Sequence, residues 1–428
     1  MYRRLLVFTC KLLIKVLRLL GKNGSALPGL IIEGLYPDFL DKSLTSVQQK
    51  IILVTGTNGK TTTTKMLVAA LRGTGARVVT NATGSNMTRG LIAALIEDMS
   101  YFGIIKPTDW FVFEMDEAYA PIFTNNISPM MVVALNVLRD QLDRYGEIDK
   151  TAQLIKRAAL KAKTFIYNEL DPLLAGVAVQ LRENSVVTRS FGASKDLLKN
   201  ISNEQTLHGE SVITELETPS TEVVSVEAAL DTQLIALRTG DEMVKLQIPV
   251  KGFHNVLNAA AVISVLNELV PERLAQAKAA IEHMPVPFGR GEKLHIRGKS
   301  ITVALVKNPS GFASNLETFV KQANPEVVVF VVNDKFADGR DMSWLWDVSF
   351  KDAIPKSATI FTSGTRGYDI AVRLKHDGIE SNTLTSIPKI IQLLMKSNYK
   401  NVVIIPTYTA LFEVRTALKR YGKVPRIW

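Results

Sequence analysis

The stretch Lys50–Thr62, which reads KIILVTGTNGKTT, decides the fold of this chain. It opens with a short apolar run rich in β-branched residues, the pattern of a buried parallel strand. A turn with two glycines follows at once, and Thr61–Arg72 then carries helix-forming residues at helical spacing. The order strand, glycine turn, helix predicts the first unit of a doubly wound α/β sheet.

The glycine turn also predicts a site for the phosphates of a nucleotide. Backbone N–H groups of such a loop and the N-terminus of the following helix attract phosphate oxygens. Lys60 would reach the β- and γ-phosphates of ATP, and Thr61 would ligate Mg²⁺. The spacing departs from the standard phosphate loop, because Val54 stands where the first glycine would be. The residues expected to hold the nucleotide here are Gly56, Thr57, Asn58, Gly59, Lys60, Thr61 and Thr62.

The alternation of strands and helices continues along the chain and predicts two α/β domains. After the first helix, strands are expected at Ala76–Val79, Trp110–Glu114 and Met130–Leu135, with helices at Gly90–Met99 and Lys150–Lys161. A β-rich excursion follows at about residues 185–250. Beyond it the pattern predicts the helices Asn255–Leu269 and Glu272–Met284, a linker at 285–290, and the strands Ile301–Val306, Val327–Val332, Thr359–Thr362 and Asn401–Pro406.

These patterns divide the chain into three expected parts. Residues 1–47 form an N-terminal arm, in which Gly21, Gly24, Pro28 and Gly29 indicate a loop. Residues 48–284 form a central ATP-binding domain with a mostly parallel sheet. Residues 285–428 form a smaller, Rossmann-like α/β domain.

Composition limits the class of protein and its partners. The 428 residues are 46% hydrophobic and 21% charged, which excludes a disordered chain. A net charge of +10 favours anionic partners, yet no zinc finger or RNA-recognition motif indicates nucleic acid. The single cysteine, Cys10, cannot form a disulfide within the chain and excludes a four-cysteine zinc site. We therefore expect a cytoplasmic protein.

The opening stretch Met1–Leu20 predicts a basic amphipathic helix. Lys11, Lys15 and Arg18 interrupt its apolar residues, so no run is long enough to cross a bilayer or to act as a signal peptide. Two interpretations stay open for such a helix. It either docks on its own protein or contacts the inner face of the cytoplasmic membrane peripherally.

The GTNGKTT form of the loop resembles Mur ligases and folylpolyglutamate synthetases, a resemblance that implies ATP and Mg²⁺ as cofactors. Glu114 resembles the acidic residue with which these enzymes hold metal, although a solvated run of acids is the alternative. Gln141 stands where the superfamily has a metal-binding histidine. Lys156, fifteen residues further on, matches a lysine that many Mur ligases carbamylate to bind metal, but a surface lysine on a helix fits equally well.

Two further segments match the nucleotide site of these ligases. The run GFHNVLN resembles a helix start that contacts nucleotide, and it implies that Asn255 and Asn258 bind there. His254 fits a nucleotide contact or an ordinary capping or packing role. Arg290 resembles the linker arginine that reaches the phosphates when the domains close.

Longer segments resemble the MurT group of Mur-type ligases, and they lie at Asn81–Gly90, Asn333–Asp347, Ser363–Arg366 and Pro406–Ala410. The resemblance implies amidation of the α-carboxyl of D-glutamate in the lipid II stem peptide, through an acyl phosphate. It also implies ammonia from a separate GatD-like glutaminase subunit in a heterodimer. Because only about 48 residues precede the phosphate loop, we expect no separate UDP-binding domain. A stand-alone amino-acid ligase similar to folylpolyglutamate synthetase is the alternative.

The chain departs from this pattern in two respects, of which the second is that no Asp precedes Lys307, where many Mur ligases use one on ribose. The first departure concerns zinc. MurT proteins usually carry a four-cysteine zinc ribbon, whereas residues 185–250 contain no cysteine, so no zinc is expected. The group also uses an aspartate to complete the glutaminase triad across the subunit boundary. We assign that role to Asp341 first, with Asp338 and Asp347 as alternates. The other interpretation is that these acids cap a loop while Trp344 and Trp346 fill a core.

Overall fold

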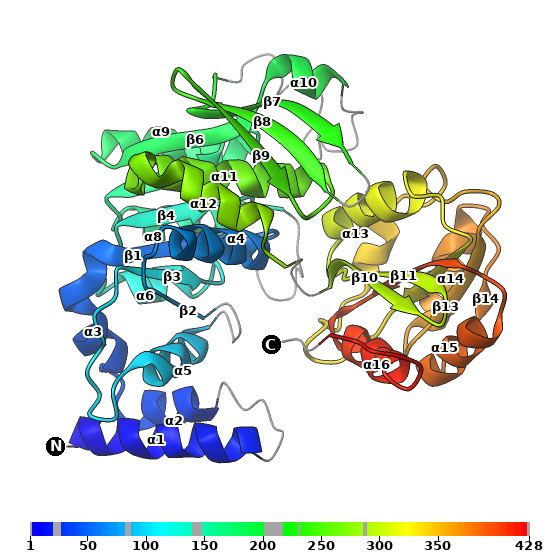
Figure 1. Cartoon of the computed structure of the whole chain (residues 1–428), viewed down its shortest axis with the longest axis horizontal. Helices are drawn as coiled ribbons and strands as arrows, with labels where there is room; N and C mark the ends of the chain where they lie inside the picture. The colour runs from blue at the N-terminus through cyan, green and yellow to red at the C-terminus, as the bar shows by residue number, and fades with distance from the viewer. Residues whose placement is uncertain are drawn as a thin grey trace. The chain divides into compact units, whose positions relative to one another are not determined.

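The computed structural model describes residues 2–19, 27–81, 87–138, 148–200, 217–229, 232–285 and 289–425. The chain forms two compact units (Figure 1). The first comprises residues 1–137, 148–249 and 255–284, and the second comprises residues 138–147, 250–254 and 285–428. Each unit has its own sheet and its own core.

The sheet of the first unit has the strand order β2-β3-β1-β4-β5-β6-β7-β8-β9. Its first seven strands in this order pair in parallel, whereas β7, β8 and β9 form an antiparallel meander. The strand bounds are β1 Ile51–Thr55, β2 Val78–Thr80, β3 Trp110–Glu114, β4 Met131–Ala134, β5 Thr164–Asn168, β6 Val187–Ala193, β7 Thr221–Ala228, β8 Gln233–Thr239 and β9 Glu242–Ile248. The predicted α/β class is confirmed, and β7, β8 and β9 lie within the segment for which a β-rich excursion was predicted.

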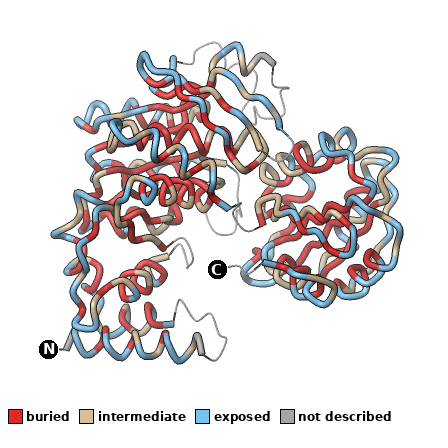
Figure 2. Tube along the Cα trace, in the orientation of Figure 1, coloured by how far each residue is buried: buried red, intermediate tan, exposed pale blue. Residues whose placement is uncertain are grey.

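Strand β1 lies between β3 and β4 and is buried along its whole length (Figure 2). Burial on both faces explains why its sequence is continuously apolar rather than alternating. The helices of this sheet are α4 Lys60–Gly73, α5 Thr88–Asp98, α6 Ala120–Thr124, α8 Ile148–Ala159, α9 Pro172–Glu183, α10 Lys195–Asn200, α11 Phe253–Leu269 and α12 Leu274–Glu282, with the short turn η4 Pro271–Arg273 before α12.

The N-terminal arm is helical and packs on the first unit. It consists of α1 Tyr2–Leu19, α2 Leu27–Leu35, α3 Phe39–Leu44 and η1 Thr45–Lys50. The prediction of a loop at Pro28 and Gly29 is wrong, because both lie in α2. Proline is tolerated in the first turn of a helix. A Cβ on Gly29 would lie 2.0 Å from the carbonyl oxygen of Arg89, so the glycine permits close packing of α2 on α5.

The second unit has a six-stranded sheet of order β10-β11-β15-β12-β13-β14. In this order, β11, β15, β12, β13 and β14 pair in parallel with their neighbours. Strand β10 pairs antiparallel with β11 in a hairpin that was not predicted from the sequence. The bounds are β10 Arg290–Ile296, β11 Lys299–Ala304, β12 Val327–Val331, β13 Thr359–Ser363, β14 Asn382–Thr383 and β15 Asn401–Pro406. The helical segments are α13 Pro309–Asn315, η5 Leu316–Lys321, η6 Ser343–Asp347, α14 Gly367–His376, α15 Ile387–Lys396 and α16 Tyr408–Leu418.

Within the described ranges, no single helix is both long and apolar enough to cross a membrane. Helices α11 and α12 pass that test only as a pair, and the pair is bent by 119°.

Candidate active site

The phosphate loop, residues 55–62, joins β1 to α4 at the carboxyl end of the first sheet. Gly56 and Gly59 adopt positive φ angles of 120° and 88°, a region that favours glycine. A Cβ on Gly59 would lie 2.3 Å from Oδ1 of Asn258, and one on Gly56 would lie 2.9 Å from the carbonyl oxygen of Asn136. Both glycines are therefore required by conformation and by close approach.

Asn136, which follows β4, holds the phosphate loop in shape. The backbone N–H of Asn58 donates to Asn136 Oδ1 at 2.8 Å, and Asn136 Nδ2 donates to the carbonyl oxygen of Asn58 at 3.0 Å. The backbone N–H of Thr57 donates to the carbonyl oxygen of Asn136 at 2.9 Å. No role for Asn136 was predicted from the sequence. The available signal was an asparagine two residues after the neighbouring strand, at the same edge of the sheet.

Lys60 and Glu117 form a buried ion pair beneath the loop. Lys60 Nζ lies 3.4 Å from Glu117 Oε2, and the two side chains are 7% and 5% exposed. The ammonium also donates to the carbonyl oxygens of Gly56 and Thr57. Burial of an ammonium is costly unless it is paired and hydrogen-bonded, and both conditions are met here. The pairing of Lys60 with Glu117 was not predicted from the sequence.

Thr61 and Glu114 supply two oxygens that fit a magnesium ion. Thr61 Oγ1 donates to Glu114 Oε1 at 3.0 Å. Adjacent ligands of an octahedral Mg²⁺ at about 2.1 Å from the metal lie about 3 Å apart, so both oxygens fit one ion. The backbone of Glu114 is fixed by Asn81, whose side-chain amide pairs with its N–H and C=O at 2.8 Å each. Within the described part of the chain no group of three or more His, Cys, Asp or Glu side chains could hold a metal. Nucleotide-bound Mg²⁺ is generally held by one or two protein ligands together with phosphate oxygens and water.

The start of α11 reaches the same loop. Asn258 lies against Gly59, and its Nδ2 donates to Asn255 Oδ1 at 3.2 Å, so both predicted asparagines belong to the loop's surroundings. Thr62 is buried in the first turn of α4. Lys156 is half-buried on α8. Gln141 lies outside the described residues.

His254 and Arg290 lie in the second unit. His254 Nδ1 and Ser314 Oγ are 2.6 Å apart in a hydrogen bond. Desolvation lowers the pKa of His254 to about 4, with a smaller contribution from the positive charge of Arg290. A neutral imidazole bound to Ser314 fits the packing interpretation of this histidine.

Three segments that resemble MurT meet at the carboxyl end of the second sheet. They follow β12, β13 and β15, which are neighbours in that sheet. Asn333 donates through Nδ2 to Thr409 Oγ1 at 3.1 Å and accepts from the N–H of Thr365 at 3.1 Å. Asp334 accepts from Thr365 Oγ1 and from Arg366 Nε, each at 2.8 Å. The Thr365 hydrogen bond is the first cause of the lowered pKa of Asp334, and Arg366 adds to it.

The three candidate aspartates differ in their surroundings within the acid loop, residues 333–347. Asp338 is buried, and its two oxygens accept from the N–H of Thr409 at 2.7 Å, the Thr409 hydroxyl at 2.5 Å and the N–H of Lys335 at 3.1 Å. Asp341 is half-buried and accepts from the N–H of Ser343 at 2.8 Å. Asp347 is exposed. The interpretation that these acids cap a loop therefore fits Asp338 well and Asp341 in part.

The two tryptophans beside these aspartates also differ. Trp344 is buried against Phe312 in the core of the second unit. Trp346 is 53% exposed and lies edge-on to His376. Core filling thus describes one tryptophan, whereas the other is available at the surface.

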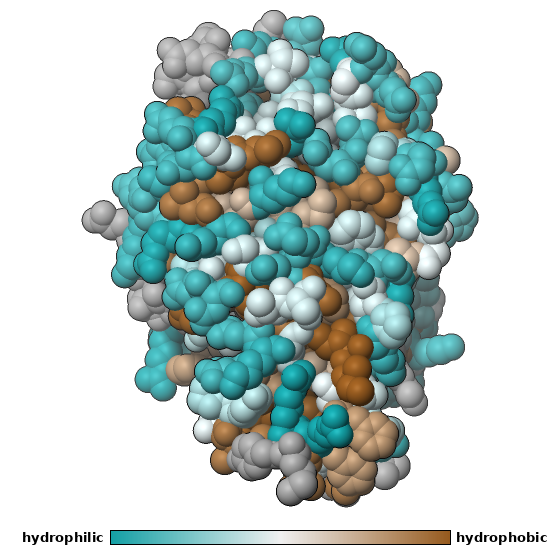
Figure 3. Space-filling view, turned by 90° about the vertical axis from the view of Figure 1, so that its left-hand side faces the viewer, coloured by the Kyte–Doolittle hydropathy of each residue, from teal (hydrophilic) through white to brown (hydrophobic). Residues whose placement is uncertain are grey.

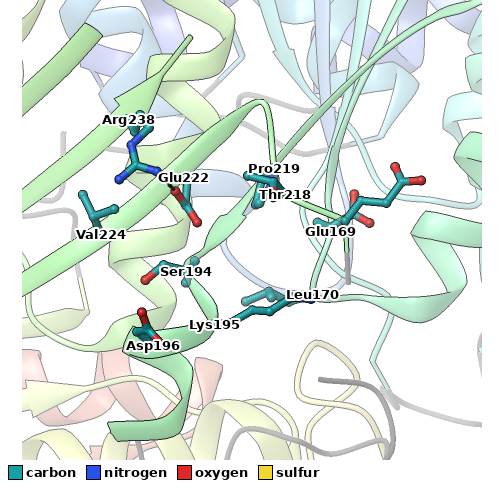
Figure 4. A pocket seen from close by; sticks show the side chains of 12 residues that line it. Glu169, Leu170, Ser194, Lys195, Asp196, Thr218, Pro219, Glu222, Val224 and Arg238 are labelled. Carbon is teal, nitrogen blue, oxygen red and sulfur yellow. Dashed lines mark hydrogen bonds and ion pairs between the residues drawn. The ribbon is translucent and has the colours of Figure 1, made fainter. Parts of the chain in front are cut away.

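A cavity of about 360 Å³ lies beyond the carboxyl ends of β5 and β6. Figure 4 shows that Arg238 and Glu222 point toward one another at its edge, where they form an ion pair of 3.0 Å. Ser194 and Glu169 line the same cavity. None of the residues predicted to act in the site lines it.

Comparisons with known proteins found two matching families. The Mur ligase middle domain family matches residues 54–266, and the MurT ligase C-terminal family matches residues 305–411. The MurT subunit of lipid II isoglutaminyl synthase (glutamine-hydrolyzing) from Staphylococcus aureus strain COL is 27% identical, over 97% of each chain. The subunit of the same name from Streptococcus pneumoniae R6 is 28% identical, over 94% of each chain.

Solved structures share the fold. MurF from Acinetobacter baumannii aligns with a TM-score of 0.68 and 16% identity, over 92% of this chain and 80% of its own. Folylpolyglutamate synthase from Mycobacterium tuberculosis, in complexes with ADP and AMPPCP, aligns with a TM-score of 0.61 and 15% identity, over 93% and 99%. The fold and the phosphate loop define an ATP-dependent ligase of the Mur type. Within that class, the chain is similar to MurT proteins along nearly its whole length and matches both domain families named above.

Proposed function

We propose that this chain is the synthetase subunit of a lipid II isoglutaminyl synthase. It would convert the α-carboxyl of D-glutamate in the lipid II stem peptide to the amide, in peptidoglycan biosynthesis. The names of the relatives from Staphylococcus aureus and Streptococcus pneumoniae support the substrate class. The observation that carries the chemistry is the phosphate loop, where Thr61 and Glu114 place two oxygens 3.0 Å apart beside Lys60.

The proposed reaction has two steps. A carboxylate oxygen of the acceptor attacks the γ-phosphorus of ATP, and ADP leaves. The nitrogen of ammonia then attacks the acyl carbon, phosphate leaves, and the nitrogen loses a proton. Lys60 and the loop N–H groups orient the phosphates and offset the charge that builds up during transfer. A magnesium ion held by Thr61 and Glu114 would supply further charge stabilisation.

Other predicted residues keep proposed roles around this centre. Asn255 and Asn258 border the loop and would contact the nucleotide. Arg290 would reach the phosphates from the second unit. Gln141 and Lys156 would contribute to a second metal site, for which an amide oxygen is a weaker ligand than imidazole. Zinc has no role in this proposal.

The partner is proposed to be a GatD-like glutaminase, because the relatives are named as subunits of a glutamine-hydrolysing enzyme. Asp341 is the preferred candidate for the residue that completes the partner's triad. Asp338 has both carboxylate oxygens bound to the loop and α16, whereas Asp341 is half-buried and accepts from the N–H of Ser343 at the end of the same loop. The exposed Trp346 and Phe336 of the same loop suit a protein interface.

The test is reconstitution with lipid II, ATP and Mg²⁺, using mass spectrometry to detect the amide. We expect ammonium salts to support amidation with this chain as the only ligase. Glutamine should support it only when the glutaminase subunit is added. Incorporation of an amino acid in place of ammonia would instead establish the stand-alone ligase.

A further inference from the structure

The outer side of α1 is an apolar surface that the protein leaves open. Val7, Cys10 and Ile14 point into the core of the first unit and are at most 7% exposed. Leu5, Phe8, Leu12 and Val16 recur at intervals of three or four residues on the opposite side and are 44–62% exposed. Spacing of this kind places them in one stripe along the helix. One side of α1 is therefore packed on the protein, and the other side is apolar and exposed.

A loop from a distant part of the chain extends this stripe. Residues 100–106 expose Tyr101, Phe102 and Ile104, of which Phe102 is 67% exposed. The rings of Phe8 and Tyr101 lie 6.0 Å apart, so the loop and α1 form one continuous surface. Figure 3 shows apolar side chains (brown) beside hydrophilic ones (teal) at the lower end of this unit, where Figure 1 places α1. Clustering of this many exposed apolar side chains marks an interaction surface.

Basic side chains flank the stripe on its loop side. Lys11 and Lys15 lie over the ring of Tyr101 at 5.3 and 5.4 Å, and Arg4 and Lys106 are exposed nearby in the sequence. No acidic residue occurs in α1. Among the adjoining carboxylates on α5, Asp98 forms an ion pair with Arg77 at 2.5 Å, and Glu97 offers its backbone carbonyl to Lys11. The surface is therefore apolar with a cationic border.

We propose that this surface, made of α1 and residues 100–106, binds an anionic lipid bilayer. Apolar side chains of such a helix enter the boundary between headgroups and acyl chains, while lysine and arginine stay at the level of anionic headgroups. Aromatic side chains favour the same depth. A second copy of this chain fits less well, because a symmetric contact would set the cationic border of each copy against that of the other.

The consequence for the reaction rests on the proposed function, since lipid II is an acceptor held in a membrane by its lipid. Binding through α1 would keep the ligase on the surface where the acceptor is found. Binding to lipid itself does not depend on that function. The two can therefore fail separately.

The experiment measures co-sedimentation of the full chain with vesicles of phosphatidylcholine alone or mixed with phosphatidylglycerol. We expect binding to the anionic vesicles only, weakened by salt. Phe8→Glu with Leu12→Glu should weaken it at least about tenfold, because both carboxylates would enter the apolar layer. Arg4→Gln with Lys15→Gln should weaken it less. Val179→Glu and Met243→Glu, at exposed apolar positions of α9 and β9, are the matched controls and should bind normally.

Several results would overturn the proposal. The first is that the wild type does not bind, and the second is that it binds both vesicle types equally. The third is that the variant Phe8→Glu with Leu12→Glu binds unchanged while its melting temperature equals that of the wild type. A wild-type dimer that this pair dissociates, without vesicle binding, would assign the surface to a second copy. Amidation of a water-soluble acceptor with a short lipid tail tests the function separately. Amidation of this acceptor should be equal in wild type and variants, whereas amidation of an acceptor in vesicles should be lower in the variants.

Discussion

The phosphate loop and the acid loop occupy equivalent places in two different sheets. Each follows a buried parallel strand, β1 or β12, at the carboxyl edge where α/β proteins bind ligands. The phosphate loop is one contiguous segment, and the first turn of α4 completes it. The acid loop is held by residues from three segments, those after β12, β13 and β15.

This difference determines what each loop offers to a ligand. At the phosphate loop, Lys60 and Glu117, a residue that follows β3, are buried and face one another. In the acid loop the buried carboxylate, Asp338, is used to hold the loop on α16, and the groups left near the surface are Asp341, Trp346 and Asp347. The first loop is therefore built to surround a small anion, and the second is built to present a surface.

The largest expected effect is at Lys60. Lys60→Met should lower ATP turnover at least about 1000-fold, because the phosphates lose their cation. It should also lower the free energy of unfolding by about 3–5 kcal/mol, because Glu117 would stay buried without its partner. Adding Glu117→Gln should recover much of the stability and none of the turnover. Urea unfolding and an ADP-release assay measure the two quantities.

The control for the Lys60 variants is Lys65→Met, which changes a half-buried lysine on the same helix but outside the loop. It should retain turnover within about twofold, since surface substitutions away from a site change little. Wild-type turnover in folded Lys60→Met would contradict the phosphate-loop assignment. An unfolding free energy that Glu117→Gln fails to restore would contradict the buried pairing.

A smaller effect distinguishes the aspartates of the acid loop. In the reconstituted pair of subunits, Asp341→Asn should reduce glutamine-driven amidation about 100-fold or more while ammonium-driven amidation persists, because the ligase centre is untouched. Asp338→Asn should instead lower the free energy of unfolding by about 1–2 kcal/mol, since one oxygen that accepts from Thr409 and Lys335 is replaced. Normal glutamine hydrolysis by Asp341→Asn would exclude Asp341 from the triad, and Asp347→Asn would then be examined.

The two loops also differ in how far the sequence alone could predict them. Residues Gly56 to Thr62 are contiguous, so spacing placed them at the end of β1 before any tertiary contact was known. The roles of Glu117 and Asn136 were not predicted, because they depend on how neighbouring strands bring these residues to the loop. In the acid loop the sequence identified the segments but could not separate Asp338 from Asp341. The separation depends on Thr409, which lies 71 residues away from Asp338.

The same reasoning explains which elements of the fold were missed. The buried strands β1 and β12 were predicted to within one residue at each end, because burial on both faces requires continuous apolar runs. Helix α2 was read as a loop, because the close approach of Gly29 to Arg89 is a tertiary contact. The hairpin strand β10 has polar residues alternating with apolar ones and begins in the predicted linker. Local pattern therefore predicted the centre of each sheet better than its edges.

The smallest expected effect is a dependence of stability on pH in the second unit. The pKa of His254 is about 4 in the folded chain, against about 6.5 in an unfolded one. Between these values the unfolded chain binds a proton and the folded chain does not. The stability that a neutral His254 supplies is thus complete above about pH 6.5 and is lost as pH falls toward 4. The loss from pH 7 to pH 5 should be about 1–2 kcal/mol.

Urea unfolding followed by tryptophan fluorescence measures this effect, because Trp344 reports on the core of the second unit. His254→Gln preserves a hydrogen-bonding partner for Ser314 and should flatten the profile between pH 7 and pH 5. Arg290→Gln removes the nearby positive charge, so it should raise the pKa of His254 toward its unfolded value and make the loss of stability smaller. Other groups that titrate in this window act equally in wild type and variants, so the difference between their profiles isolates His254. Superimposable profiles for wild type and His254→Gln would show that the imidazole is not held neutral by its surroundings. His254 would then be open again to a nucleotide contact.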